Sequence, residues 1–352
     1  MKVRARVGVF PAYDDNPYIT LLTLAARARG YEFVESTSLE GLERTAAQLG
    51  SGDALHLHWT APIVQRASSA DEAATRAARF RTAVDGAASR GARVLWTLHN
   101  VVPHDVRHEA IELELCRYLA ERADVIHTMT DDVAEVAAPF YALDARKIVV
   151  IPHPSYQGVY PSQVDRGDAR SRFGLAEGEH AILFFGQLRP YKGLDALLSA
   201  VALASPRPPV LLLAGRAGDD DRAAIEALLP DGVRVITHYE HVDDADVQRW
   251  FRAADVAVLP YRRVLNSGTL HLAATFGLPV VLPDEVHLRR AFGGEEWIAW
   301  FDPARPVESL ADLLGSPTTF ELPREAAAAF SHRLAPYALS ERYADLLDAR
   351  LG

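Results

Sequence analysis

Short apolar segments alternate with amphipathic helical segments along nearly the whole chain, and this alternation constrains the fold more than any other feature. Strands that alternate with helices favour a parallel sheet with helices on both faces. In the first half we expect strands near 4–10, 31–35, 53–58, 93–98, 124–128 and 147–151, and helices near 17–29, 71–90, 107–122 and 131–141.

The alternation pauses once and then resumes. Residues 152–170 contain prolines, glycine and polar residues without periodicity, which is typical of a linker or crossover. The sequence therefore predicts an α/β fold with two doubly wound parallel-sheet domains, residues 1–155 and 170–330, and a ligand cleft between them at the carboxyl ends of the strands. The strands of the second domain are expected near 181–185, 210–214, 233–236, 255–259, 279–282 and 297–301.

Charge and cysteine content exclude several classes of protein. The formal net charge of -10 over 352 residues argues against a nucleic-acid partner held by general electrostatics. The single cysteine, Cys116, excludes a disulfide framework and a cysteine zinc site. No segment resembles a signal peptide, and no apolar stretch reaches the ~20 residues that a spanning helix needs. We therefore expect a cytoplasmic protein, and peripheral contact with a membrane stays open.

A glycine turn with two cations, residues 186–193, follows the strand expected at 181–185. Gly186 opens the turn, and a helix is expected directly after it. The free N–H groups and positive dipole end of such a helix favour an anion, and Arg189 and Lys192 add two full charges. The turn predicts a diphosphate site, and a surface loop with two solvated cations is the alternative reading.

A second candidate for phosphate binding is the segment Asn266-Ser267-Gly268-Thr269, which precedes a helix expected at 270–276. Small residues at a helix start leave backbone N–H groups accessible, and the hydroxyls of Ser267 and Thr269 can bond phosphate oxygens. We predict that Ser267, Gly268 and Thr269 contact the diphosphate. A simple helix cap explains the same residues without any ligand.

Two histidines follow the strand expected at 93–98. Its carboxyl end leads into His99 and, five residues later, His104. An imidazole at this edge of a parallel sheet is suited to act as a general base toward an acceptor hydroxyl, or to bond a hydroxyl of a donor sugar. His99 is the first choice and His104 the second, and histidines satisfied by neighbouring backbone remain the alternative.

Further candidates for the acceptor side occur in the first half of the chain. Two histidines on one face of the strand at 53–58, His56 and His58, are too few for a metal site, and one or both are expected near the acceptor with Trp59 as an apolar platform. The loop after the first strand offers sugar-binding groups or a simple helix cap. We predict acceptor contacts from Tyr13, Asn16, Tyr18, His58, Trp59 and His104.

The second half offers further groups near a nucleotide. Gly215 ends the strand expected at 210–214, and His238 and Tyr239 follow the strand at 233–236. Together with Gly186 these residues are predicted to contact the nucleotide. Asp284 and Glu285 are candidate carboxylates, although capping of the following helix explains them as well.

These features occur together in one known family. The two α/β halves, the 186–193 turn and the segments 254–260 and 276–281 make the chain similar to the GT-B glycosyltransferases, in particular the family 4-like group. The resemblance spans almost the full length and is strongest over 182–302. It implies a nucleotide-sugar site in the second half, an acceptor site in the first half, and a carboxyl-terminal helix, residues 331–352, that packs back on the first domain.

The resemblance also implies roles for individual residues. Arg189 and Lys192 would neutralise the donor diphosphate, and His99 occupies the place of a functional histidine, so these three are the predicted catalytic residues. The family usually carries two glutamates separated by seven residues; here the corresponding positions are about Val264 and Leu272, so both carboxylates are absent.

The sequence as a whole predicts a hexosyltransferase that uses a UDP- or GDP-sugar. Cations and a helix N-terminus stabilise the departing nucleoside diphosphate, so neither a metal ion nor another cofactor is expected. A nucleotide-sugar 2-epimerase shares the two α/β halves and is one alternative. A non-catalytic nucleotide-sugar-binding protein, suggested by the missing glutamates, is the other.

Overall fold

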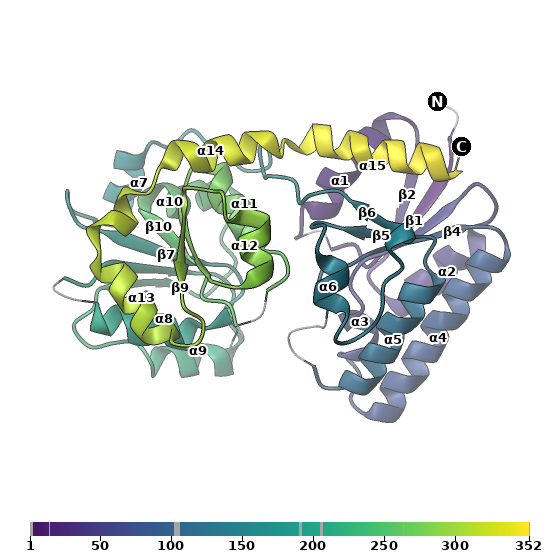
Figure 1. Cartoon of the computed structure of the whole chain (residues 1–352), viewed down its shortest axis with the longest axis horizontal. Coiled ribbons are helices and arrows are strands. Elements are labelled where there is room, and N and C mark those ends of the chain that lie inside the picture. Colours follow the sequence, from purple (N-terminus) through teal and green to yellow (C-terminus); the bar gives the residue numbers. More distant parts are fainter. Residues whose placement is uncertain are drawn as a thin grey trace. The chain divides into compact units, whose positions relative to one another are not determined.

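The computed structural model describes residues 3–13, 15–101, 106–189, 192–204, 207–262 and 264–351. By its internal contacts the chain divides into two compact units, Met1–Pro154 with Pro336–Gly352 (unit 1) and Ser155–Ala335 (unit 2). Each unit contains one six-stranded sheet with helices around it (Figure 1). All the described strand pairs are parallel. The predicted class, two doubly wound parallel α/β domains, is confirmed.

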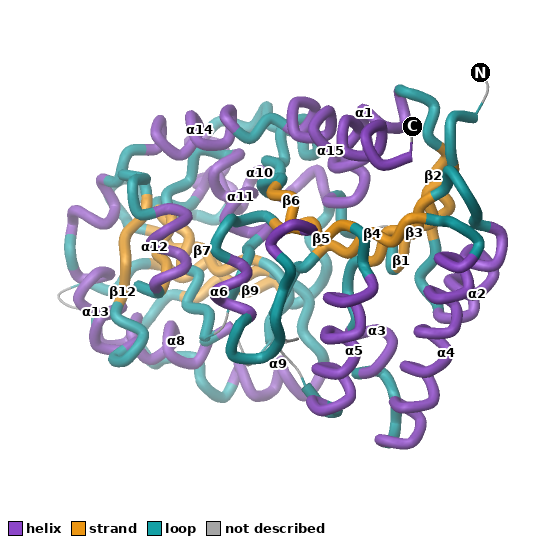
Figure 2. Tube along the Cα trace, turned by 45° about the vertical axis from the view of Figure 1, so that its right-hand side comes forward, coloured by secondary structure: helices purple, strands orange, loops and turns teal. Residues whose placement is uncertain are grey.

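Unit 1 is built on a sheet of strand order β2-β1-β3-β4-β5-β6. Its strands are β1 (Arg6–Phe10), β2 (Glu32–Glu35), β3 (Ala54–Leu57), β4 (Arg93–Thr97), β5 (Val125–Thr128) and β6 (Ile148–Val150). Its helices are α1 (Tyr18–Ala28), α2 (Leu39–Gln48), α3 (Ala61–Val64), α4 (Ala70–Ser89), α5 (Glu109–Arg122), α6 (Val133–Ala137) and α15 (Pro336–Leu351), with a 3-10 turn, η1 (Ala145–Lys147). Helices α1 and α15 cover one face of the sheet, and α2, α4 and α5 cover the other (Figures 1 and 2).

Helix α15, the last segment of the chain, therefore belongs to the body formed by the first 154 residues. It lies along α1, where the backbone N–H of Ala25 donates to Ser340 Oγ over 3.2 Å. Tyr343, Ala344 and Leu347 on α15 are fully buried. Burial of these side chains is the main physical reason for the docking of this helix, because removal of apolar area from water contributes about 25 cal/mol per Å².

Unit 2 has the strand order β12-β11-β10-β7-β8-β9. Its strands are β7 (Ala181–Phe185), β8 (Val210–Ala214), β9 (Val235–His238), β10 (Val256–Val258), β11 (Val280–Pro283) and β12 (Ile298–Phe301). Its helices are α7 (Arg166–Arg172), α8 (Leu194–Leu203), α9 (Asp219–Glu226), α10 (Asp244–Ala253), α11 (Gly268–Thr275), α12 (Val286–Phe292), α13 (Pro306–Gly315) and α14 (Arg324–Arg333), with a 3-10 turn, η3 (Pro317–Glu321). Leu197 and Val201 of α8 and Leu310 of α13 pack on one face of this sheet.

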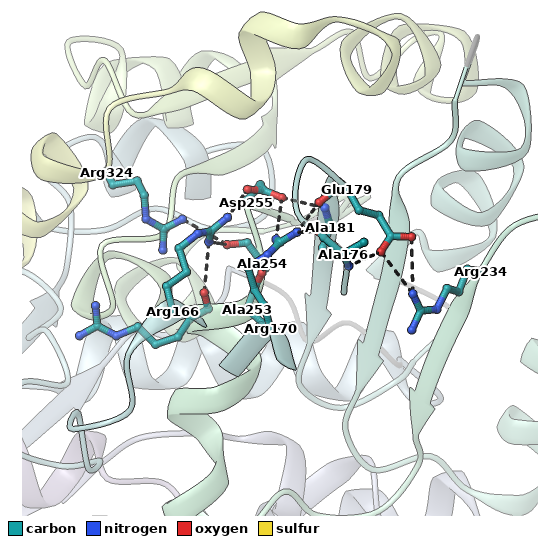
Figure 3. A network of polar contacts seen from close by, with 11 residues as sticks. Arg166, Arg170, Ala176, Glu179, Ala181, Arg234, Ala253, Ala254, Asp255 and Arg324 are labelled. Atoms are coloured by element: carbon teal, nitrogen blue, oxygen red, sulfur yellow. Dashed lines mark hydrogen bonds and ion pairs between the residues drawn. The ribbon is translucent and has the colours of Figure 1, made fainter. Parts of the chain in front are cut away.

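An arginine network fastens α7 to the edge of the unit 2 sheet where strands begin (Figure 3). Asp255 directly precedes β10 and pairs with both Arg166 and Arg170 of α7. The same carboxylate accepts a hydrogen bond from the backbone N–H of Ala181, at the start of β7, over 2.8 Å. Burial and the neighbouring Arg166 lower the pKa of Arg324 to about 10. This charged cluster lies at the amino ends of the strands, so it is structural and separate from the glycine turns described below.

All twelve expected strands are present, each within two residues of its expected position. The prediction of helices was incomplete. Helix α2 was missed, although Ser38 caps it by accepting from the N–H of Gly41 over 3.1 Å. Helix α7 begins inside the segment expected to be a linker, because Asp165 caps its first turn. Among the described helices, none is both long and apolar enough to cross a membrane.

Candidate active site

A chain of hydrogen bonds runs through the interior of unit 1 and fixes His56. His56 Nδ1 lies 2.8 Å from Tyr343 Oη, and its Nε2 lies 2.7 Å from Thr97 Oγ1. Thr97 Oγ1 lies 3.0 Å from His127 Nδ1, and His127 Nε2 lies 3.0 Å from the carbonyl oxygen of Ile151. A carbonyl oxygen only accepts, so His127 Nε2–H donates to it. Each earlier group then donates to the next, beginning at Tyr343, and His56 is a structural residue.

His99, the predicted catalytic histidine, lies two residues after the end of β4 and contacts three rings. Its Nε2 lies 3.0 Å from His58 Nδ1. The indole of Trp59 stacks on it, with centroids 4.0 Å apart and planes 17° apart. Tyr18 meets it edge-on at 5.1 Å. The structure thus brings together four of the residues predicted for catalysis and acceptor binding, and one face of Trp59 is already covered by imidazole.

The imidazoles of unit 1 form an uncharged cluster. Burial lowers the pKa of His127 and of His153 to about 4. Burial also holds the pKa values of His58 and His99 well below the usual range, and the neighbouring imidazoles lower both further. All four rings are therefore neutral near pH 7, and hydrogen bonding rather than charge determines what they can do.

The other acceptor-side candidates have mixed outcomes. Tyr13 meets Trp59 at 5.8 Å. The side-chain oxygen of Asn16 accepts from the backbone N–H of Tyr18 over 3.1 Å, so it caps α1. Tyr18 is buried and faces His99 rather than solvent. His104 lies outside the described residues. Contact of these side chains with an acceptor remains a prediction.

The structure adds Asp132, which the sequence reasoning missed. Asp132 follows β5, the neighbour of β4 in the sheet, and its side chain is only 7% exposed. Within the described part of the chain, neither carboxylate oxygen has a hydrogen-bond partner. A buried carboxylate without partners is costly unless it meets a ligand. In the sequence, only the position of Asp132, four residues after the end of a strand, could have indicated a functional role.

In unit 2, glycines allow three loops to approach one another closely at the carboxyl ends of the strands. Gly186 and Gly215 follow β7 and β8 and have φ values of 111° and 143°. A Cβ atom on Gly215 would lie 1.9 Å from the carbonyl oxygen of Gly186. Gly193 has φ 70°, and a Cβ there would lie 2.0 Å from the carbonyl oxygen of Pro260. Only glycine fits at these positions.

The cation of Lys192 lies at this glycine edge. A Cβ on Gly186 would lie 3.1 Å from Lys192 Nζ and 3.6 Å from Thr269 Oγ1, so the two polar atoms converge on the same glycine. Lys192 Nζ also lies 5.6 Å from the centre of the Tyr261 ring. Among the described residues no carboxylate pairs with Lys192, which leaves its charge available for an anion.

The other predicted cation, Arg189, is exposed and lies 3.6 Å from a carboxylate oxygen of Asp221. That distance is too long for a hydrogen bond, and the contact between two solvated groups is weak. A diphosphate would compete with Asp221 for the guanidinium. The role of Arg189 therefore remains a prediction.

Helix α11 begins where the second phosphate candidate was expected. Ser267 Oγ accepts from the N–H of Leu270 over 3.3 Å, so it caps the helix, and Gly268 is the first helical residue. The side-chain nitrogen of Asn266 is buried and has no hydrogen-bond partner in the described part of the chain. Ser267 thus caps the helix, as the alternative interpretation expected. This uses one lone pair of its hydroxyl oxygen, and the O–H can still donate to a ligand.

The residues predicted beside the base lie at the end of β9. The N–H of Gly215 donates to the carbonyl oxygen of His238 over 2.9 Å, which ties the two loops together. The His238 ring faces a cavity of about 550 Å³ that Phe173 and Trp250 also line. Arg222 lies over the ring of Tyr239 at 5.0 Å. These contacts show that the side chains of His238 and Tyr239 pack against their neighbours. Their contact with a nucleotide base remains a prediction.

The candidate replacement carboxylates are engaged locally. Asp284 accepts two hydrogen bonds from Arg289, over 2.7 and 2.9 Å, and this pairing lowers the pKa of Asp284. Glu285 lies 3.5 Å from His287. Val264 and Leu272, at the positions of the missing glutamates, are buried apolar side chains. Within the described residues of this region, no free carboxylate replaces the glutamate pair.

The chain contains two Asp-x-Asp triplets, a pattern typical of metal-bridged diphosphates, although the prediction of a metal-free site assumed that it contains none. They are Asp219–Asp221 and Asp244–Asp246, in the first turns of α9 and α10. Acidic residues are favoured there by the helix dipole, which explains them without a metal. The described residues contain no cluster of three or more side chains able to hold a metal ion. Metal independence remains a prediction.

Comparison with known proteins supports the predicted fold class and enzyme class. A family model described as "Glycosyl transferases group 1" matches residues 179–315. The GDP-mannose:glycolipid 4-beta-D-mannosyltransferase of Xanthomonas campestris is 26% identical over 276 residues, which cover 78% of this chain and 71% of that protein. A D-inositol 3-phosphate glycosyltransferase of Arthrobacter is 33% identical over 135 residues, 36% of this chain and 31% of that protein.

Solved structures share the fold over nearly the full length. Sucrose-phosphate synthase from Thermosynechococcus elongatus has a TM-score of 0.75 at 15% identity, and the match covers 98% of both chains. HepE from Anabaena, in complex with UDP and glucose, has a TM-score of 0.71 at 15% identity, covering 98% of this chain and 100% of that one. The solved structures show that the chain has the fold of the GT-B glycosyltransferases, and the family model and the curated relatives support a glycosyltransferase of the family 4-like group.

Proposed function

We propose that this glycosyltransferase moves a hexose from a nucleoside-diphosphate sugar to the hydroxyl of a glycolipid or glycan acceptor, without a metal ion. The observation that carries the proposal is the convergence of Lys192 Nζ, Thr269 Oγ1 and Gly186 at the carboxyl edge of the unit 2 sheet. This arrangement offers a diphosphate one hydroxyl, the backbone of the glycine turn, and one cation that no carboxylate of the described residues pairs with.

GDP-mannose is the first donor to test. The mannosyltransferase of Xanthomonas campestris, whose name specifies GDP-mannose and a glycolipid, matches 78% of this chain at 26% identity. The solved structures in complex with UDP or UDP-glucose match at 14–16% identity, which supports the fold and leaves UDP-sugars as the second class.

The proposed chemistry is stabilisation of the leaving nucleoside diphosphate. Negative charge grows on the diphosphate as the bond to the sugar breaks, and Lys192 with the first N–H groups of α11 would meet that charge. Arg189 would add a second cation if the ligand draws it from Asp221. In unit 1, His99 would contact the sugar or the acceptor.

The test is calorimetric titration of the wild-type protein with GDP and UDP, repeated on Lys192→Ala and on Lys147→Ala. Lys147 is a matched control because its ammonium binds the carbonyl oxygen of Glu121, far from the turn in sequence. We expect micromolar binding of one nucleotide, a loss of at least about 10-fold in Lys192→Ala, since one charged contact contributes about 1.5–3 kcal/mol, and no loss in Lys147→Ala.

Transfer assays with the preferred sugar nucleotide then test the reaction, with and without EDTA. Equal rates in both would support the metal-free reaction, and loss of transfer on chelation would overturn it. Release of an epimerised sugar without any acceptor would point to the 2-epimerase. Failure of both nucleotides to bind would contradict the donor site.

A further inference from the structure

The two nitrogens of His99 have different surroundings. Its Nε2 is engaged with His58 Nδ1 at 3.0 Å. Its Nδ1 makes no hydrogen bond with the described residues and is not one of their buried unpartnered atoms, so it stays accessible to a ligand. The stacking of Trp59 and the edge of Tyr18 prevent the ring from turning to exchange the two nitrogens.

The direction of the His58–His99 hydrogen bond follows from the far side of His58. Both rings are neutral, so each carries one N–H proton, and only one of the facing nitrogens can donate. His58 Nε2 is buried without a partner in the described part of the chain. If His99 Nε2 donated, His58 would carry its proton on Nε2, as a buried donor with no acceptor.

The opposite direction avoids that cost. If His58 Nδ1–H donates to His99 Nε2, His58 Nε2 is a bare lone pair, and buried acceptors without partners are tolerated better than buried donors. His99 then carries its proton on Nδ1, at the accessible side of the ring. Its only lone pair is occupied by His58.

We propose that His58 is a positioning residue that holds His99 with its proton on Nδ1, so that His99 donates a hydrogen bond to a hydroxyl oxygen of the substrate and does not act as the general base. This inference rests on the proposed function, which places His99 beside the substrate. It decides between the two roles that an imidazole at this strand end can have. Removal of the acceptor proton then falls to another group.

The tautomer is measured directly by long-range ¹H–¹⁵N spectra of the wild-type protein with ¹⁵N-labelled histidine, assigned with His99→Gln. We expect a protonated Nδ1 and an unprotonated Nε2 for His99. The reverse pattern would overturn the inference. Because this readout needs neither nucleotide nor acceptor, it stands or fails independently of the proposed reaction.

Kinetics of two His58 variants test the positioning role. Asparagine places an amide N–H where Nδ1–H lies in histidine, whereas alanine removes the donor. We expect His58→Ala to lower kcat roughly 10- to 100-fold, as for the lost outer partners of metal-bound histidines, with unchanged nucleotide affinity. His58→Asn should recover most of that loss.

Equal activity of His58→Ala and wild type would overturn the positioning role even if the enzyme transfers sugar normally. Equal loss in both variants, with folding preserved by circular dichroism, would show that the donated hydrogen bond is not what His58 supplies. If His58→Ala does not fold, the wild-type spectrum and His58→Asn still decide the question.

Discussion

The two candidate half-sites are built in different ways. In unit 1 the candidate histidine, His99, is held by other side chains: His58 by hydrogen bonding and Trp59 by stacking. In unit 2 the phosphate candidates are held by backbone, because Gly186 and Gly215 let the loops approach closely. Unit 1 thus presents neutral, oriented hydrogen-bonding groups, and unit 2 presents a cation and backbone N–H groups. This difference is the one expected under the proposed function, in which unit 1 contacts a hydroxyl group and unit 2 binds a diphosphate.

The backbone nature of the unit 2 site is tested most severely by Gly215→Ala. The new Cβ would lie 1.9 Å from the carbonyl oxygen of Gly186 and would force the two loops apart. We expect nucleotide binding to fall at least ~100-fold, because displaced backbone contacts cannot be replaced by side chains. Calorimetric titration measures the loss.

Gly232→Ala is the matched control for that variant. Gly232 also has a positive φ, 74°, but nothing lies within 4 Å of an added Cβ. It places a side chain at a positive φ without the clash. If Gly215→Ala binds the nucleotide as Gly232→Ala does, the close approach of the two loops is not needed for the donor site.

The neutral histidine cluster predicts that unit 1 loses stability in acid. His127 and His153 titrate at about 4 in the folded protein and near 6.5 when unfolded, so between these values the unfolded chain binds more protons. Stability is full above about pH 6.5 and falls as the pH drops toward 4. One full pH unit of differential protonation is worth about 1.36 kcal/mol per group, and the unfolded rings are only half protonated at pH 6.5, so the two residues account for roughly 3 kcal/mol between pH 6.5 and 5.

Denaturant unfolding followed by circular dichroism at pH 7.5, 6.5 and 5.0 measures that change. His127→Gln removes one of the titrating rings while keeping an amide N–H for the carbonyl oxygen of Ile151. In this variant the free energy of unfolding should depend less steeply on pH, by the contribution of one titrating proton. A wild-type free energy of unfolding that does not change over this range would contradict the neutral cluster.

The same contrast explains what sequence could and could not predict. The unit 2 turn is local: Gly186, Lys192 and Gly193 lie within eight residues, and their types alone indicated phosphate chemistry. The unit 1 network is long-range, since His56 bonds Tyr343, 287 residues away in the chain. Periodicity locates each strand, but it cannot show which side chains meet across the sheet, so the structural role of His56 was not predictable.

Asp132 tests whether unit 1 supplies a charged group as well as neutral ones. If this carboxylate meets the substrate, Asp132→Asn should lower kcat about 10- to 100-fold, within the range for a lost acid–base group, and leave nucleotide affinity unchanged. Asp131→Asn is the matched control, because its neighbour Asp131 is exposed. Equal kcat values for the two variants would show that the Asp132 carboxylate does not take part in the reaction.

Ser267 gives the smallest expected effect and tests how far the unit 2 site depends on side chains. Its hydroxyl accepts from the N–H of Leu270 as a helix cap, and Ser38 caps α2 in the same way with the N–H of Gly41. Replacement by alanine should cost about 1 kcal/mol of stability at either site. Only Ser267→Ala should also weaken nucleotide binding, by roughly 5-fold, the value of one neutral hydrogen bond. Thermal unfolding and calorimetric titration of both variants separate the two roles: equal nucleotide affinity in Ser267→Ala and Ser38→Ala would mean that Ser267 only caps α11, and that the diphosphate is held by Lys192 and the backbone.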